Sequence, residues 1–329
     1  MLKSVVLLTF LFTVSLFAAK PKDLHPNFFT ITRPGTSPSI LKVSASENEE
    51  IQRICGHDDR SNNRPQYKVS GGERASVGRF PWAVAIADTA DKVQQSTCGG
   101  TIISPKHFLS AAHCFCKYRK SDPSCTDSDV VDKILRKLIH YGGTCTRPGK
   151  HCKTANTQTT TVKKVHFARK FNHGGCRFGG DIAIVEIVGN FTFDDKTKPL
   201  CLPKPHKDDS DLNEYNVVTS YGYGKNENHE TSDSLAFVEF SSKALLFGKK
   251  IRKVMKDVVW LMPNKGNKGI CHGDSGSGLQ GSRKTDGRKI FLGIHSKGGR
   301  PCGKRQPYSS TYLPFYVKSI SKHTGVCPF

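Results

Sequence analysis

Three segments far apart in the chain contain residue types that can cooperate in breaking an acyl bond. His113 lies in the segment LSAAHC, Asp181 lies in GDIAIV, and Ser275 lies in CHGDSGSG. A serine hydroxyl becomes an effective nucleophile when a neighbouring imidazole removes its proton, and a buried carboxylate can fix the tautomer of that imidazole and stabilise its charged form. Each segment alone is typical of a packed or turn region, so the prediction of catalysis depends on all three together.

At these residues the chain resembles the chymotrypsin/trypsin family of serine proteases. That family carries its histidine in an AAHC segment, its aspartate in a DIAL-like segment and its serine in GDSGG, in this order along the chain. Asp181 and Ser275 are 275 − 181 = 94 residues apart, against roughly 93 in the family template. His113 and Asp181 are 181 − 113 = 68 residues apart, against roughly 45. We therefore expect an insertion between them, in the cysteine-rich stretch 116–152.

The resemblance implies a role for each of these residues. Ser275 would attack the peptide carbonyl, His113 would transfer the proton, and Asp181 would orient His113. The glycines around Ser275 would let the N–H groups of Gly273 and Ser275 converge on the oxyanion. The implied activity is that of a serine endopeptidase acting on proteins or peptides, and it needs no cofactor.

Short β-rich runs separated by Gly, Pro, Asn and Asp turns predict an all-β protein. The runs cover residues 80–86, 101–104, 159–167, 181–188, 215–221, 235–240 and 289–295. Many short strands at this spacing suggest a sandwich or barrels, and the resemblance implies two six-stranded antiparallel β-barrels packed together with a C-terminal helix. Residues 315–323 fit that helix, and residues 47–54 form a second helix-prone run.

The chain divides into three predicted parts. Residues 1–19 have a basic start, an apolar run and small residues for cleavage, which indicates a secretory signal peptide. A membrane anchor is the alternative, but the apolar run is shorter than the roughly 20 residues that cross a bilayer. Residues 20–68 then form a propeptide and residues 69–329 the protease domain. We expect a secreted, extracellular protein with no membrane span.

A candidate activation site begins the protease domain. The segment VSGG at 69–72, followed by FPW at 80–82, resembles the mature start of the family. Cleavage after Lys68, by an activating protease, would free the α-amino group of Val69 to pair with Asp274. A buried ammonium–carboxylate pair needs both charges, so cleavage would act as a switch on the loop that carries the oxyanion donors. The alternative is a polar turn, because Val69 and Ser70 depart from the usual Ile and Val.

Twelve cysteines in an exported chain indicate disulfides rather than a metal site. No HExxH and no repeated CxxC pair occurs, so no metal is predicted. The resemblance implies three pairs: Cys98 with Cys114, Cys271 with Cys302, and Cys55 with Cys201, the last of which would tether the propeptide. Six cysteines stay unassigned, with Cys145–Cys152 suggested only by proximity. They are Cys116, Cys125, Cys145, Cys152, Cys176 and Cys327.

The residues expected to line the substrate pocket depart from the family pattern. Gly269, six residues before Ser275, stands at the pocket floor, where trypsin-like members place an aspartate that binds Arg or Lys. Ser296 is expected to support Asp181. Lys297 replaces a usual tryptophan beside Gly298, and Tyr308 replaces a glycine that lines the pocket. A narrowed or blocked pocket is therefore possible, and no preference for basic residues is expected.

The formal net charge is +22 and the isoelectric point is about 9.6. Such a charge would concentrate anionic partners such as acidic glycans, although a solvated basic surface is the simpler interpretation because no nucleic-acid motif accompanies it. Asn190 begins an N-glycosylation sequon. The unusual pocket and the charge leave a rival hypothesis, a catalytically silent protease homologue that acts as a secreted binding protein.

Overall fold

The structure is a computed structural model, and it describes most of the chain after residue 27. The described residues are 28–58, 68–69, 72–89, 95–116, 125, 127–168, 171, 179–205, 210–225, 232–246, 255, 257–262, 269–298 and 307–329. The predicted signal peptide lies outside them. No helix in these ranges is long and apolar enough to cross a membrane.

The first sheet closes into a barrel. Its strands run in the order β1-β8-β7-β4-β5-β6-β9, and an additional pairing of β8 with β9 closes the ring of six strands from β4 to β9. All their pairings are antiparallel. The strands are β1 (Phe28–Ile31), β4 (Ala83–Ala87), β5 (Ser96–Ile102), β6 (His107–Ser110), β7 (Leu138–Tyr141), β8 (Gln158–Ala168) and β9 (Ala183–Ile187).

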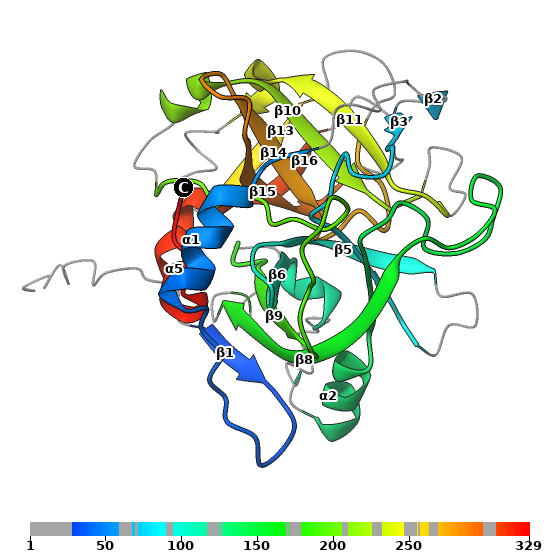
Figure 1. Ribbon diagram of the computed structural model, residues 1–329, viewed down its shortest axis with the longest axis vertical. Coiled ribbons are helices and arrows are strands. Elements are labelled where there is room, and N and C mark those ends of the chain that lie inside the picture. The colour runs from blue at the N-terminus through cyan, green and yellow to red at the C-terminus, as the bar shows by residue number, and fades with distance from the viewer. Residues whose placement is uncertain are drawn as a thin grey trace, which may run out of the picture.

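The second sheet forms a half-barrel within the described residues, with strand order β12-β13-β16-β15-β14-β10-β11-β3-β2. The prediction of an all-β, trypsin-like fold is confirmed, and Figure 1 shows the two sheets stacked in the upper and lower halves of the molecule. The strands are β2 (Lys68–Val69), β3 (Gly72–Arg74), β10 (Tyr215–Gly222), β11 (Ala236–Ser241), β12 (Leu245–Leu246), β13 (Val258–Leu261), β14 (Gly278–Arg283), β15 (Lys289–Lys297) and β16 (Tyr308–Tyr312).

Two buried polar contacts join the sheets. The indole N–H of Trp82, just before β4, donates to Oε1 of Gln280 on β14 at 2.9 Å, and the hydroxyls of Thr101 on β5 and Tyr221 on β10 lie 2.7 Å apart. Buried polar atoms are costly unless they are paired. These contacts therefore fix how one sheet sits on the other and, with it, the line along which the candidate site lies.

The α-helices that lie within the described ranges flank the sheets: they are α1 (Ala45–Ile54), α2 (Ser128–Leu135) and α5 (Val317–Thr324). The helix-prone run 47–54 and the C-terminal run 315–323 overlap α1 and α5. A capping box begins α1, because Ser44 Oγ accepts from the N–H of Glu47 while the Glu47 carboxylate accepts from the N–H of Ser44. Helix α2 lies in the expected insertion. Short 3₁₀ helices are η1 (Ala112–Cys114), η3 (Ser210–Glu214), η4 (Ser242–Ala244) and η5 (Leu313–Phe315).

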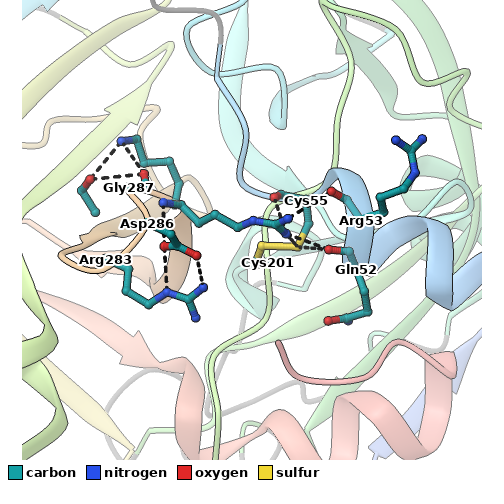
Figure 2. A network of polar contacts seen from close by, with 10 residues as sticks. Gln52, Arg53, Cys55, Cys201, Arg283, Asp286 and Gly287 are labelled. Carbon is teal, nitrogen blue, oxygen red and sulfur yellow. Dashed lines mark hydrogen bonds and ion pairs between the residues drawn. A yellow bond between two sulfur atoms is a disulfide. The ribbon is translucent and has the colours of Figure 1, made fainter.

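The part of the predicted propeptide that the structure describes is built into the fold. Strand β1 pairs with β8, and α1 lies beside α5 in Figure 1, where the amide of Gln52 donates to the carbonyl of Cys327 at 2.9 Å. The disulfide Cys55–Cys201 tethers the end of α1. The guanidinium of Arg288 donates to the carbonyls of Gln52 and Arg53 at 2.7 and 3.2 Å, in the network drawn in Figure 2.

Candidate active site

The register of two strands in the first barrel brings His113 and Asp181 together. Strand β6 pairs with β9 so that Ser110 lies opposite Ala183. The chain leaves β6 into η1, which carries His113, and it enters β9 just after Asp181. Both residues therefore lie at the same end of this strand pair, although 68 residues separate them in sequence.

Asp181 holds His113 through two hydrogen bonds. The Nδ1 atom of His113 lies 2.8 Å from Oδ2 of Asp181, and the main-chain N–H of His113 donates to Oδ1 at 3.0 Å. The hydroxyl of Ser296 also donates to Oδ2, at 2.5 Å. Ser296 thus contacts Asp181, the carboxylate that the family resemblance predicted it to support.

The carboxylate of Asp181 is buried, with 1% of the residue exposed. Burial alone would raise its pKa, but the charge of His113 and the hydrogen bonds from His113 and Ser296 outweigh burial and lower the pKa below its ordinary value. Asp181 is therefore ionised at neutral pH. A buried carboxylate in this position can fix the imidazole tautomer and stabilise its protonated form.

The loop that carries Ser275 packs between two strands and the end of β6. The N–H of Gly99 on β5 donates to the carbonyl of Ser275 at 2.7 Å, and the N–H of Gly276 donates to the carbonyl of His295 on β15 at 2.8 Å. Gly276 has φ +84°, and a Cβ there would overlap the hydroxyl of Ser110. Only glycine permits this approach. The structure thus places Ser275, which is partly exposed, next to the segment that leads to His113.

The loop before Ser275 turns sharply at Gly273, which has φ +97°. The N–H of Asp274 donates to the carbonyl of Cys271 at 3.1 Å, and the N–H of Ser277 donates to the carbonyl of Asp274 at 3.0 Å. These bonds define the main chain from which the N–H groups of Gly273 and Ser275 would act.

Val69 and Asp274, the expected partners of the activation switch, have other hydrogen-bonding partners in this structure. Lys68 and Val69 form strand β2, which pairs with β3. The carboxylate of Asp274 instead accepts from the N–H groups of Gly224 and Cys271, both at 2.8 Å. Burial raises its pKa to about 6, although those two hydrogen bonds act in the opposite direction.

The residues of the expected pocket lie against one another. A Cβ built on Gly269 would lie 3.7 Å from Cε1 of Tyr308, and a Cβ on Gly298 would lie 3.4 Å from the carbonyl oxygen of Ile270. Tyr308 is only 2% exposed. Both distances are ordinary van der Waals contacts, so the buried Tyr308 ring lies beside Gly269 and the carbonyl of Ile270 beside Gly298, while Lys297 is exposed.

Four disulfides have both cysteines among the described residues: Cys55–Cys201, Cys98–Cys114, Cys116–Cys125 and Cys145–Cys152. Cys271 is also disulfide-bonded, but its expected partner Cys302 and the unassigned Cys176 lie outside the described part of the chain. Cys327 has a free, exposed thiol. Asn190 is exposed just after β9.

One group of potential metal ligands occurs in the described ranges, formed by Cys98, His113 and Cys114. The two cysteines form a disulfide, so their sulfurs are not thiolates. This group therefore does not make a metal site.

The structure adds residues that sequence motifs did not indicate. The hydroxyl of Thr311 donates to the carbonyl of Asp181 at 2.8 Å, and the carboxylate of Asp257 accepts from the N–H of Gly180 at 2.6 Å. Both residues lie in stretches without a recognisable motif. Only their three-dimensional contacts connect them to the site.

The fold agrees with the family comparison. The family model described as Trypsin matches residues 69–320, and the chain belongs to this family. It is 26% identical over 283 residues to mannan-binding lectin serine protease 1 of Homo sapiens, covering 83% of this chain but only 38% of that protein.

Two further relatives match over most of their own length. The chain is 25% identical over 293 residues to a venom serine protease of Polistes dominula, covering 87% of this chain and 93% of that one. It is 28% identical over 278 residues to trypsin-like protease try-5 of Caenorhabditis elegans, covering 74% and 81%. All three relatives are named as proteases, which supports a serine protease.

Proposed function

We propose that this protein is a secreted serine endopeptidase with His113, Asp181 and Ser275 as its catalytic triad. The observation that carries the proposal is the buried carboxylate of Asp181 bonded to both the main chain and Nδ1 of His113, next to the loop of Ser275. This arrangement leaves Nε2 of His113 as the ring nitrogen that can act on Ser275. The relative named as a venom protease and the predicted signal peptide support export.

The proposed reaction has two steps. His113 Nε2 takes the proton of Ser275 while Oγ bonds to the peptide carbonyl carbon, and the N–H groups of Gly273 and Ser275 stabilise the oxyanion. His113 then donates that proton to the leaving amine as the C–N bond breaks, which gives an acyl-enzyme. Water enters, gives a proton to His113 and attacks the ester. The acid product leaves, and the proton returns to Ser275.

The proposed zymogen switch exchanges the partners of Asp274. Cleavage after Lys68 would release the Val69 α-amino group from the β2–β3 hairpin. Its positive charge would stabilise the ionised form of Asp274, whose pKa burial raises to about 6. The new pair would fix the Gly273–Ser275 main chain in its working form. The disulfide Cys55–Cys201 would keep the propeptide attached.

The proposed specificity is for a small residue on the acyl side of the scissile bond. Gly269 offers no carboxylate to bind a basic side chain, and the buried Tyr308 ring beside Gly269 would restrict the length of the side chain that enters. A glycine or alanine residue needs neither a deep pocket nor a carboxylate at the pocket floor. The basic net charge would in addition favour acidic surfaces or polyanions near the substrate.

The test uses the full secreted chain. A lysine-specific endoproteinase should cut after Lys68, N-terminal sequencing should then give Val-Ser-Gly-Gly, and the product should cleave a peptide library after small residues. Ser275→Ala, activated in the same way, should show no cleavage. A correctly cut wild-type protein that cleaves no peptide would contradict the proposal and favour a silent homologue that acts by binding.

A further inference from the structure

Several buried carboxylates, Asp257 among them, take no part in the proposed reaction. Asp257, just before β13, is 0% exposed. A buried carboxylate is costly unless hydrogen bonds satisfy its oxygens. The partners of Asp257 therefore indicate what this residue does for the fold.

Those partners lie directly beside the catalytic aspartate. Oδ2 of Asp257 accepts from the main-chain N–H of Gly180 at 2.6 Å and from the hydroxyl of Tyr316. Gly179 has φ +83°, and a Cβ there would overlap the Asp257 carboxylate. The two glycines thus wrap around this carboxylate, and no larger residue fits at the first of them.

The next residue in the chain is Asp181, and a second set of bonds connects it to the same support. The hydroxyl of Thr311 donates to the carbonyl of Asp181 at 2.8 Å, and the N–H of Tyr312 donates to the carbonyl of Asp257 at 2.7 Å. The 311–316 segment thus holds both aspartates. Moving Asp257 would move the turn that delivers Asp181 to His113.

We propose that Asp257 is a positioning residue for the triad, which fixes the Gly179–Gly180 turn so that both oxygens of Asp181 reach His113. The proposal rests on the proposed function for its kinetic consequence only. Its structural consequence, the His113–Asp181 hydrogen bond, exists in the uncleaved chain. It can therefore be measured whether or not the protein is active.

The experiment compares Asp257→Ala with Asp257→Asn, which keeps one acceptor oxygen. We expect Asp257→Ala to lower kcat/KM by about 100-fold, mostly through kcat, and Asp257→Asn by about 10-fold, since small displacements of a catalytic group have effects of this size. The acidic limb of the pH–rate profile should move to lower pH, because a displaced Asp181 stabilises the His113 imidazolium less. The low-field NMR resonance of the His113 Nδ1 proton should shift or vanish in the uncleaved variants.

The matched control is Asp233→Ala. Asp233 is also buried, at 4% exposed, and accepts from the N–H of His151 at 2.8 Å in the Cys145–Cys152 loop. It should lose stability but keep the acidic limb and the resonance. If Asp257→Ala does not fold, Tyr316→Phe removes one donor to Asp257 and should shift both readouts in the same direction. An unchanged resonance and an unchanged acidic limb in the Asp257 variants would overturn the proposal. If the Asp257 variants do not fold, the same result in Tyr316→Phe would overturn it. Equal shifts in the control Asp233→Ala would overturn it as well. An inactive wild type that retains the resonance would instead contradict the proposed function.

Discussion

The carboxylate of Asp274 accepts a hydrogen bond from the main-chain N–H of Gly224, 2.8 Å away, in the uncleaved chain. Gly222 and Gly224 enclose this carboxylate so closely that a Cβ on Gly222 would overlap its Oδ1. Among the residues that the structure describes, no ion pair supplies the counter-charge that the proposed activation would bring to Asp274.

The first prediction concerns the pH dependence of the uncleaved protein. The pKa of Asp274 is raised from 3.8 to about 6, so the folded state holds this proton more tightly than the unfolded chain. The contribution of Asp274 is most favourable below pH 4, and it is lost as the pH rises from about 4 to about 6. Between these pH values, the raised pKa of Asp274 changes the free energy of unfolding by about 3 kcal/mol.

Asp274→Asn removes the buried charge and should therefore raise the free energy of unfolding at pH 7 by about 1–2 kcal/mol. The gain is smaller than the full value of about 3 kcal/mol, because the amide nitrogen cannot accept the hydrogen bond from Cys271. At pH 3.5 the gain should be small. Urea unfolding at both pH values measures this difference. After cleavage the same variant should be inactive. A stability difference between variant and wild type that does not change with pH would show that burial does not raise the pKa of Asp274.

The second prediction concerns substrate choice. Tyr308→Gly should open the space next to Gly269 and extend cleavage from small to larger side chains, at a stability cost of about 3–5 kcal/mol for the cavity. Gly269→Asp alone should not create cleavage after Arg or Lys, because the proposed obstruction by the Tyr308 ring would remain.

The double variant, Gly269→Asp with Tyr308→Gly, should cleave after basic residues. Peptide-library profiling of the three variants measures this order. Cleavage after basic residues by the Gly269→Asp single variant would show that Tyr308 does not obstruct the pocket.

A third prediction concerns the attachment of the N-terminal segment. Arg288→Gln should lower the unfolding free energy by about 1 kcal/mol, because a cation that binds the last carbonyls of α1 also interacts favourably with the helix end. Arg53→Gln is the matched control, since Arg53 pairs with Glu50 on the solvent-exposed side of the same helix, and it should have no measurable effect. Guanidinium unfolding compares the stability of the two variants. Equal losses of unfolding free energy would show that the hydrogen bonds of Arg288 to α1 do not stabilise the protein.

A fourth prediction concerns acid stability. Burial lowers the pKa of His107 to about 4 and those of His166 and His295 to about 3. These imidazoles are neutral in the folded protein, while the unfolded chain binds their protons below about pH 6.5. Their contribution is therefore fully present above pH 6.5 and is lost as the pH falls toward 4 and 3.

Replacing His166 tests this directly. His166→Gln should make the loss of stability between pH 6 and pH 4 shallower by about 1.4 kcal/mol per pH unit, the value for one proton. His272→Gln, at an exposed position, should keep the wild-type slope. An unchanged slope in His166→Gln would mean that His166 is not held neutral.

The sequence predicted much of the fold where a pattern was local. The runs 159–167, 215–221, 235–240 and 289–295 overlap strands β8, β10, β11 and β15, because their apolar and β-branched residues indicate strands without further context. Strand β14 was missed because its sequence, GLQGSR, is rich in glycine and polar residues. It becomes a strand through its partners β10 and β15.

Long-range contacts explain what the sequence left open at the site. The motifs predicted which residues approach Asp181, and the structure brings His113 and Ser296 to it. Tyr308 lies beside Gly269 although 308 − 269 = 39 residues separate them, so the sequence suggested a blocked pocket without being able to place the ring. Asp257 belongs to no motif, and only its bond to Gly180 reveals it.

The central claim is that Ser275 is a nucleophile activated by His113 and Asp181. A fluorophosphonate probe applied to the full chain after cleavage at Lys68, followed by peptide mapping, tests it most directly. The account predicts one covalent adduct on Ser275, with none in Ser275→Ala and strongly reduced labelling in His113→Ala. Wild-type protein with a free Val69 terminus and no adduct on Ser275 would contradict it.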